Sequence, residues 1–313
     1  MKNQARIKVV GIGGSGGNAI SRMAKCHIQG IELIAINSDF QDLKKIKADK
    51  KVHIGIGLTQ GFGAGMDPAI GEKAAIDSLN EIKEVLQQGD IVFVTCGLGG
   101  GTGSGAVSVI ADLAKNLGSL TIGVVTLPFT FEGEQRKKIA KGALEKLKDK
   151  VDTLFVISNN KLLNAIDEKT SLNDAFWKAD EVLRQAVQGI SDLIVRPGLI
   201  NVNFADLKSI MKDAGFALFG VGKAKGENKV KEAAHKAINS PLLDLSTSKG
   251  AHGILFNITG GKNLTLNDVE EAGKIITQNA ANGAKIIFGA IQDEKKFADD
   301  EVEITVIATG IEK

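Results

Sequence analysis

The run Gly97-Leu98-Gly99-Gly100-Gly101-Thr102-Gly103-Ser104-Gly105 constrains this chain more than any other segment. It follows an apolar run at 90–96 and precedes a helix-like run at 106–114. Its many glycines lose much backbone entropy on folding, which is expected where a backbone must approach a ligand closely. The free N–H groups and the positive dipole end of a helix start attract phosphate. The pattern therefore predicts a strand, a phosphate-binding loop and a helix, rather than a flexible linker.

Length and composition predict a globular protein of two domains. The chain has 313 residues, of which 43% are hydrophobic and 24% charged, and its net charge is +2. This balance, without a sustained Lys/Arg run, predicts no nucleic-acid partner. Cys26 and Cys96 are the only cysteines and the histidines are scattered, so no residue is predicted as a metal ligand. No signal peptide or membrane-length apolar run is present, so we expect a cytoplasmic protein without direct membrane insertion.

The first half of the chain alternates strand-like and helix-like runs, which predicts a Rossmann-like, mostly parallel α/β sheet. Helices are expected to begin near Asn18, near Pro68 and after the glycine run. The expected strands are 6–12, 32–37, 52–56, 91–96, 120–125 and 151–158.

A long helix is predicted next, because apolar residues from Leu172 to Ile194 recur at steps of three and four. Ser171 with Asp174 resembles a capping box at its start, and Pro197 and Gly198 should end it. The remaining segments predict a smaller α+β domain. Its expected strands are 215–224, 253–258, 285–291 and 301–309, and its expected helices are 229–239 and 267–282.

A second glycine motif, Gly11-Ile12-Gly13-Gly14-Ser15-Gly16, follows the first strand and matches GxGxxG. With Glu32 near the position of a ribose-binding acid, it is a weak indication of a dinucleotide-dependent oxidoreductase. Two phosphate loops in one sheet instead favour a triphosphate held from two sides. The P-loop pattern GxxxxGK[ST] is absent, so backbone N–H groups, helix ends and Mg²⁺ would have to meet the phosphate charge.

Residues 99–105 also resemble the GGGTG[ST]G signature of the tubulin/FtsZ family of GTPases. The similarity is to the FtsZ branch and runs from about residue 7 to residue 310. It implies a GTP-binding domain at 1–170, a central helix at 171–196 and a C-terminal activation domain at 197–313. It further implies a cytoplasmic GTPase at the division site that binds GTP or GDP with Mg²⁺. Such proteins polymerise head to tail with themselves into filaments of the cell-division ring.

The resemblance also implies which residues contact the nucleotide. Thr126 to Arg136 resembles the ribose segment, in which Glu132 accepts from ribose hydroxyls and Arg136 reaches phosphate or ribose. Asn159 and Asp180 would read the guanine edge, and Phe176 would stack on the base. The implied contacts are Gly13, Gly14, Ser15, Gly16, Asn18, Asn37, Asp39, Gly63, Ala64, Gly65, Gly99, Gly100, Gly101, Thr102, Gly103, Ser104, Gly105, Thr126, Pro128, Glu132, Arg136, Asn159, Phe176 and Asp180.

One of these contact loops departs from the family pattern. Gly63-Ala64-Gly65-Met66-Asp67-Pro68 resembles the loop at the terminal phosphate, where the family usually has Asn before Pro. Asp67 is therefore expected to place a mildly unfavourable charge beside the phosphates and to lower nucleotide affinity.

The segment Asn201-Val202-Asn203-Phe204-Ala205-Asp206 resembles the family's catalytic loop, Asn-x-Asp-Phe-Ala-Asp. In the family this loop enters the nucleotide site of the next subunit and orients or polarises the attacking water. Asp206, Asn203 and Asn201 are therefore the predicted catalytic residues. Asn203 replaces an acid, which predicts slower hydrolysis with nucleotide binding and polymerisation retained. Asp206 is also a candidate N-cap for the helix that follows.

Two other function classes stay open at this point. An FtsZ-like filament or regulatory protein with weak or no hydrolysis is favoured by Asn203, and a Rossmann oxidoreductase by residues 11–16. The sequence ends three residues after Gly310, so the family's usual C-terminal adaptor-binding peptide is expected to be absent, through truncation or a shorter natural chain. Cell-division adaptors that bind elsewhere stay as candidate partners.

Overall fold

The computed structural model describes residues 5–26, 28, 30–163, 171–196, 198–240, 250–278 and 280–311. Pro197, an expected end of the long helix, lies outside these residues. The chain divides into two compact units, Met1–Ser191 and Asp192–Lys313. Within the described residues, no helix combines the length and apolarity needed to cross a membrane.

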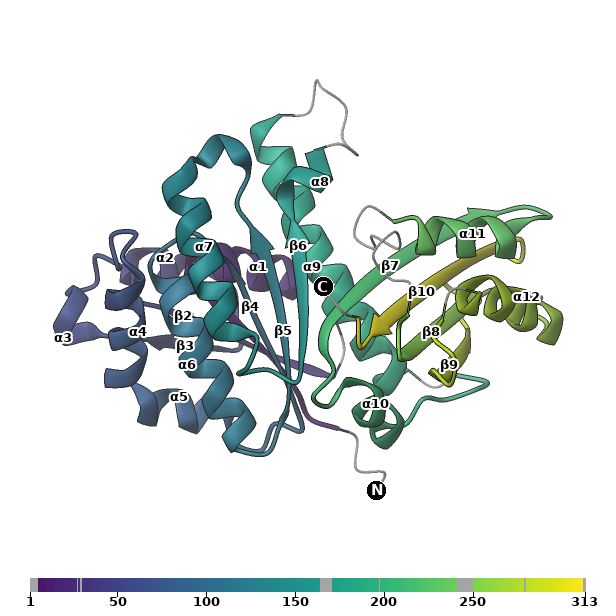
Figure 1. Cartoon of the computed structure of the whole chain (residues 1–313), viewed down its shortest axis with the longest axis horizontal. Helices are drawn as coiled ribbons and strands as arrows, with labels where there is room; N and C mark the ends of the chain where they lie inside the picture. Colours follow the sequence, from purple (N-terminus) through teal and green to yellow (C-terminus); the bar gives the residue numbers. More distant parts are fainter. Residues whose placement is uncertain are drawn as a thin grey trace. The chain divides into compact units, whose positions relative to one another are not determined.

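In the part of the chain that the structure describes, the first unit contains six parallel strands in the order β3-β2-β1-β4-β5-β6 (Figure 1). Every residue of β1 is buried, as expected for a parallel strand that helices cover on both faces. The predicted mostly parallel α/β sheet is confirmed. The strands are β1 (Ile7–Ile12), β2 (Ile31–Asn37), β3 (Lys50–His53), β4 (Ile91–Gly97), β5 (Leu120–Leu127) and β6 (Thr153–Ser158).

Helices cover both faces of this sheet. The chain moves across the sheet in one direction from β1 to β2 and in the opposite direction from β4 to β5, so right-handed crossovers place the connecting helices on opposite faces. α1 (Gly13–Lys25) lies on one face, and α6 (Thr102–Asn116) lies on the other with α4, α5 and α7 (Figure 1). Besides α1, α6 and the long helix described below, the helices of this unit in the described residues are α2 (Phe40–Lys45), α3 (Ile56–Thr59), α4 (Pro68–Asp77), α5 (Leu79–Leu86), the 3-10 turn η1 (Thr130–Glu132), α7 (Glu134–Leu147) and α8 (Asn159–Leu163).

Two boundaries differ from the sequence prediction. α1 begins at Gly13, five residues before the expected start at Asn18, so the first glycine loop forms the opening turns of the helix. A Cβ at Gly16 would lie 2.6 Å from the carbonyl oxygen of Thr95, which shows that glycine is needed there for the helix to pack on β4. The strand expected at 52–56 ends at His53, because Gly55 adopts a φ of +63° and α3 begins at Ile56.

The predicted long helix is α9 (Leu172–Val195). Ser171 forms one half of the expected box at its start, because its hydroxyl accepts from the Asp174 N–H at 3.2 Å; the same hydroxyl, rather than the Ser171 backbone N–H, donates to Oδ2 of Asp174 at 2.7 Å. These bonds satisfy a helix N–H group that would otherwise lack a partner.

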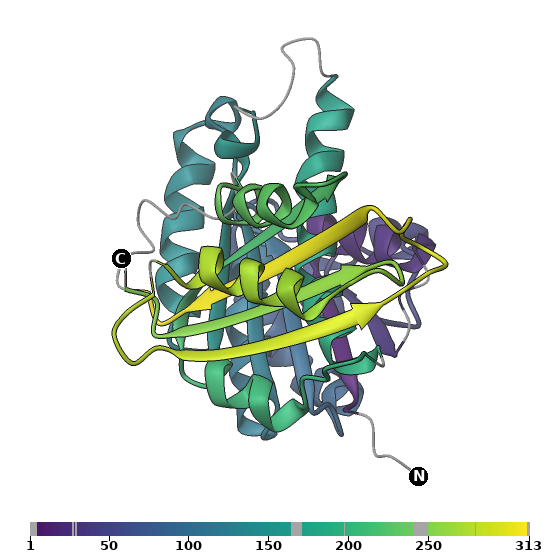
Figure 2. The same ribbon diagram turned by 90° about the vertical axis from the view of Figure 1, so that its right-hand side faces the viewer.

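The second unit, within the described residues, holds a mixed sheet in the order β7-β10-β8-β9. Two helices, α11 and α12, pack on one face of it (Figure 2), and buried residues such as Ala233, Phe256 and Val302 form the core between them. α12 ends at Thr277, before the expected end at residue 282. The elements are α10 (Phe204–Met211), β7 (Gly215–Lys225), α11 (Lys229–Ile238), β8 (Gly253–Gly260), α12 (Leu266–Thr277), β9 (Lys285–Gln292) and β10 (Glu301–Thr309).

Candidate functional site

The carboxyl ends of β1 and β4 form a switch point, because the chain leaves these neighbouring strands in opposite directions. α1 begins at Gly13 directly after β1, and α6 begins at Thr102 after the glycine run that follows β4. The first N–H groups of each helix have no partner within the helix, and the two dipoles add positive potential. Two helix starts therefore meet where the sequence predicts a phosphate site.

A cavity of about 570 Å³ opens at this edge of the first unit, a size typical of small-molecule sites. Most of the predicted contacts line it, and they come from the ends of β1, β2, β4, β5 and β6 and from α9. The lining residues among them are Gly13, Gly14, Ser15, Asn37, Asp39, Gly63, Ala64, Gly65, Gly100, Gly101, Thr102, Gly103, Thr126, Pro128, Glu132, Arg136, Asn159, Phe176 and Asp180.

Five predicted contacts, Gly16, Asn18, Gly99, Ser104 and Gly105, do not line the cavity. Two of them are packing positions, since a Cβ at Gly105 would lie 2.0 Å from the Pro68 carbonyl oxygen and Gly16 packs against Thr95. Gly99 turns the loop with a φ of +112°, and the Ser104 hydroxyl accepts from its N–H at 2.9 Å. Asn18 is exposed on α1. Packing and hydrogen bonding thus account for much of this glycine signature.

Some residues that line the cavity were not predicted from the sequence, and Asp42 is the charged residue among them. Asp39 caps α2 by accepting from the Asp42 N–H at 2.9 Å, and the Asn37 amide donates to Oδ2 of Asp42 at 3.3 Å. The spacing Asp39-x-x-Asp42 at a helix start could have indicated that both carboxylates face the strand end. The other unpredicted lining residues are Ile12, Phe62, Met66, Gly97, Leu98 and Ala179.

Asp67 does not line the cavity, which differs from the expectation of a charge facing the phosphates. It is the N-cap of α4, and its Oδ1 accepts from the Ala69 N–H at 2.8 Å. The helix start offsets the carboxylate charge, because the helix dipole favours an anion at this end.

Among the lining residues, Phe176 offers an aromatic surface for a base. Its ring contacts the buried ring of Phe129 edge to face at 5.3 Å between centroids, which fixes its orientation. Asn159 is 5% exposed, and its Oδ1 has no hydrogen-bond partner among the described residues. A buried acceptor without a partner is costly unless a ligand supplies the donor. This orphaned oxygen therefore indicates a polar ligand edge.

Asp180 lies on α9 beside Phe176 and also lines the cavity. Burial raises the pKa of its carboxyl to about 6, although the charge of Arg22 and its hydrogen bond act in the opposite direction. The Arg22 Nε lies 2.9 Å from Oδ2 of Asp180. The carboxyl is therefore ionised at neutral pH and can accept hydrogen bonds from a base.

The segment after β5 presents a second carboxylate. Glu132 accepts from the Phe129 N–H through Oε1 at 2.8 Å, and its Oε2 pairs with Nη1 of Arg136 at 3.3 Å. Both charged side chains line the cavity, where an acceptor and a donor can contact sugar hydroxyls and phosphate.

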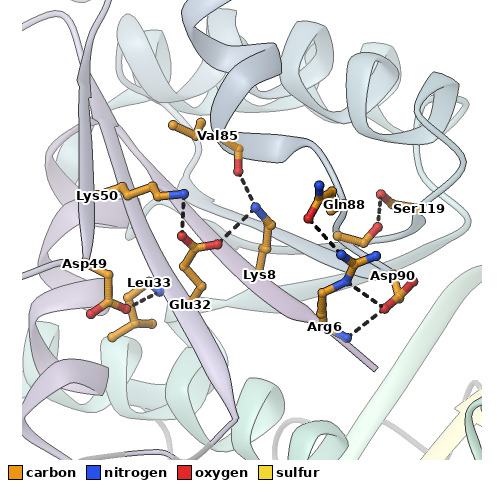
Figure 3. A network of polar contacts seen from close by, with 11 residues as sticks. Arg6, Lys8, Glu32, Leu33, Asp49, Lys50, Val85, Gln88, Asp90 and Ser119 are labelled. Carbon is orange, nitrogen blue, oxygen red and sulfur yellow. Dashed lines mark hydrogen bonds and ion pairs between the residues drawn. The ribbon is translucent and has the colours of Figure 1, made fainter. Parts of the chain in front are cut away.

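Glu32, the ribose acid of the dinucleotide hypothesis, lies at the amino end of β2, whereas Asn37 at its carboxyl end lines the cavity. Glu32 pairs with Lys8 at 3.0 Å and Lys50 at 2.7 Å, and Lys8 also donates to the Val85 carbonyl at 2.6 Å (Figure 3). Burial alone would raise the pKa of Glu32, but the two lysines together lower it. The dinucleotide hypothesis therefore lacks its acid at the site.

The predicted catalytic residues lie in the second unit and are not among the residues that line the cavity of the same chain. Asn201 accepts from the Gly198 N–H at 2.7 Å through Oδ1. Asn203, rather than Asp206, is the N-cap of α10, and Asp206 occupies the third helical position of a capping box. The expected cap at Asp206 is thus wrong by three residues, because Asn203 directly precedes the first helical turn and its Oδ1 accepts from the Asp206 N–H.

Comparison with known proteins covers both units. The profile of the tubulin/FtsZ family, GTPase domain, matches residues 6–167, and that of the FtsZ family, C-terminal domain, matches residues 215–312. The structure of an empty FtsZ dimer from M. jannaschii has a TM-score of 0.92 and 46% identity, covering 99% of this chain and 89% of that chain. A mutant of FtsZ from M. jannaschii gives the same TM-score and identity, with 99% and 92% covered.

A more distant structure, a GTPγS-bound protofilament of CetZ2 from Haloferax volcanii, has a TM-score of 0.84 and 19% identity. It covers 98% of this chain and 94% of that chain, and it shows the shared fold alone.

Proposed function

Because the chain belongs to the tubulin/FtsZ family of GTPases, within its FtsZ branch, we propose that it forms head-to-tail filaments at the division site and hydrolyses GTP between adjacent subunits. The cavity of the first unit binds the guanine nucleotide. The loop at 201–206 of the next subunit completes the hydrolytic site. The observation that carries this proposal is the cavity itself, whose lining combines two helix starts with Phe176, Asn159 and Asp180.

The two helix starts and the glycine backbones hold the phosphates through N–H groups. Ser15 strengthens this region, because its hydroxyl accepts from the Gly97 N–H at 2.7 Å and keeps its own proton for a phosphate oxygen. Met66 and Phe62 also line the cavity and add apolar surface to it.

Mg²⁺ fits this donor set, since hard cations prefer carboxylate and phosphate oxygens. Asp39 and Asp42 both line the cavity and, within the described residues, neither forms an ion pair with Lys, Arg or His. Glu132 and Asp180 are instead paired with arginines. Asp39 and Asp42 would therefore hold the ion together with phosphate oxygens, where it would neutralise developing charge.

Phe176 stacks on the guanine ring, while Asn159 and Asp180 form hydrogen bonds with its polar edge. A carboxylate accepts from the N1–H and the 2-amino group of guanine, neither of which adenine presents. The orphaned Oδ1 of Asn159 would receive a donor at the same time. GTP and GDP are thus favoured over ATP.

For hydrolysis, water attacks the terminal phosphorus, the bond to the bridging oxygen breaks, and GDP and phosphate leave. Asp206 of the neighbouring subunit orients this water, with Asn203 and Asn201 as polar contacts of lower basicity. A head-to-tail contact of this kind is heterologous and extends into a filament unless rotation closes it. The empty FtsZ dimer from M. jannaschii supports self-association.

A second candidate, an FtsZ-like filament protein with weak hydrolysis, is favoured by Asn203 alone. Both candidates place the protein in the cytoplasm at the division site.

Competition binding tests the base assignment. The wild type should bind GTP and GDP at least about fivefold more tightly than ATP, because lost base contacts leave buried groups unpaired at a cost of about 1–3 kcal/mol. Asp180→Ala should weaken GDP and leave the poor ATP binding unchanged. Asp77→Ala, at an exposed aspartate of α4 outside the cavity, serves as the matched control. Equal affinity of the wild type for GTP and ATP would defeat the proposal.

A further inference from the structure

Arg22 on α1 contacts one face of α9 without lining the cavity. Its Nε lies 2.9 Å from Oδ2 of Asp180, and its guanidinium carbon lies 5.9 Å from the ring centroid of Trp177. Trp177 and Asp180 are three residues apart, so they lie on the same side of the helix. The guanidinium is thereby held between a ring and a carboxylate and has a defined orientation.

Asp180 needs such a partner to act as an anion. Its side chain is only 13% exposed, and desolvation favours the protonated form of a buried carboxyl. A protonated carboxyl keeps one oxygen as a hydroxyl donor, so it cannot accept from two N–H groups of a base edge. A nearby cation opposes this preference, and Arg22 supplies both charge and a hydrogen bond.

The other charged groups near Asp180 form ion pairs with other residues. Glu181, the next residue on α9, pairs with Arg184 on the same helix. Glu132 and Arg136, which line the same cavity, pair with each other at 3.3 Å. Among the described residues, Arg22 is thus the cation that contacts Asp180.

We propose that Arg22 is a positioning residue for base selectivity: it holds Oδ2 of Asp180 through one hydrogen bond, keeps the carboxylate ionised and leaves Oδ1 and the second lone pair of Oδ2 for the guanine edge. This inference rests on the proposed role of Asp180 in guanine binding. Arg22 itself touches no ligand, so its effect on affinity passes entirely through Asp180.

Trp177 provides a direct probe, because it is the only tryptophan of the chain and contacts Arg22. GDP would be titrated into the intact protein and followed by Trp177 fluorescence, with calorimetry as an independent measure. Arg22→Gln should lower GDP affinity about tenfold at pH 7.5, the scale of one charge-assisted hydrogen bond. Lys25→Gln removes a cation from an exposed position one turn further along α1 and should bind GDP as the wild type does.

The pH profile separates positioning from a merely structural effect. The quantity to follow is the ratio of the GDP affinity of the wild type to that of Asp180→Ala, because titration of the nucleotide phosphates affects both proteins equally. This ratio should fall about fourfold between pH 7.5 and pH 5.5. Arg22→Gln should begin this fall at higher pH, because the carboxyl protonates more readily without its partner. Arg22→Lys keeps a cation but not the planar fork. It should displace the wild-type profile upward by less than Arg22→Gln does and cost less affinity.

The outcomes distinguish the inference from the proposed function. If Asp180→Ala weakens GDP binding while a folded Arg22→Gln keeps both the wild-type affinity and the wild-type pH profile, the positioning role of Arg22 is overturned. If Asp180→Ala binds GDP as the wild type does, the base contact is absent and the inference falls with it. Should Arg22→Gln not fold, an Arg22→Lys profile displaced upward supports the inference, and a loss of affinity equal at every pH contradicts it.

Discussion

Asn203 and Asp206 cap one another at the start of α10. Oδ1 of Asn203 accepts from the Asp206 N–H at 2.8 Å, and Oδ2 of Asp206 accepts from the Asn203 N–H at 3.3 Å. The loop expected to act in hydrolysis is therefore fixed by the helix that follows it. Asn and Asp are about equally good N-caps, so the change from the family's Asp to Asn203 alters the charge of the loop while preserving its helix start.

Substitutions at residue 203 should separate these two roles. Asn203→Ala should lower the free energy of unfolding by about 1 kcal/mol, the usual cost of a lost cap, as measured by urea denaturation. Asn203→Asp should stay within a few tenths of a kcal/mol of the wild type because it keeps the cap. It should also raise GTP turnover by restoring a carboxylate. Unchanged turnover in Asn203→Asp would mean that the missing acid does not limit hydrolysis.

Two signature glycines should respond in opposite ways to alanine. A Cβ at Gly105 would lie 2.0 Å from the Pro68 carbonyl oxygen, so Gly105→Ala should destabilise the protein by at least about 3 kcal/mol. A Cβ at Gly100 meets nothing within 4 Å and projects from a lining residue of the cavity. Gly100→Ala should therefore unfold within about 0.5 kcal/mol of the wild type and bind GDP more weakly. Tight GDP binding by Gly100→Ala would exclude a nucleotide from this part of the cavity.

Asp180 should make the stability of the nucleotide-free protein depend on pH. Its folded pKa of about 6 lies above the ordinary 3.8, so between about pH 4 and pH 6 the folded protein binds more protons than the unfolded chain. The contribution of Asp180 to the free energy of unfolding therefore falls as the pH rises, by no more than about 3 kcal/mol in total. The free energy of unfolding of the wild type minus that of Asp180→Asn, measured by chemical denaturation, should fall between about pH 4 and pH 6 and stay constant above pH 6. A difference that grows with pH would have the wrong sign.

Much of the fold could be predicted from the sequence, because apolar periodicity and glycine runs act locally. The strand at 301–309 and the helix from Leu172 lie where their patterns place them. Most of the cavity lining could be named as well, since the loops that form it follow strands whose carboxyl ends share one edge.

What the sequence could not resolve depends on contacts between elements. Gly16 and Gly105 were predicted to contact the nucleotide, but only the packing of α1 on β4 and of α6 on α4 shows why glycine is required there. Asp42 was missed although its spacing from Asp39 at a helix start could have indicated it, and the capping contact with Asp39 brings it to the cavity. The pairing of Arg22 with Asp180 joins residues 158 positions apart.

Asp206→Ala should lower GTP turnover by about 100-fold or more, the scale of a positioned acid or base. GDP affinity of the isolated chain should hardly change, since Asp206 is not among the residues that line its cavity. Asp206→Ala protein mixed with wild type should also inhibit hydrolysis at mixed contacts. Hydrolysis by the variant at the wild-type rate would remove Asp206 from the mechanism.

The central claim is that two chains share each hydrolytic site, and phosphate release measured against protein concentration tests it most directly. With GTP and Mg²⁺ present, light scattering and phosphate release would be recorded together over a wide range of concentration. The account predicts that turnover per chain is negligible at low concentration and rises where scattering reports assembly. A turnover per chain that stays constant while scattering remains that of the monomer would contradict a shared site.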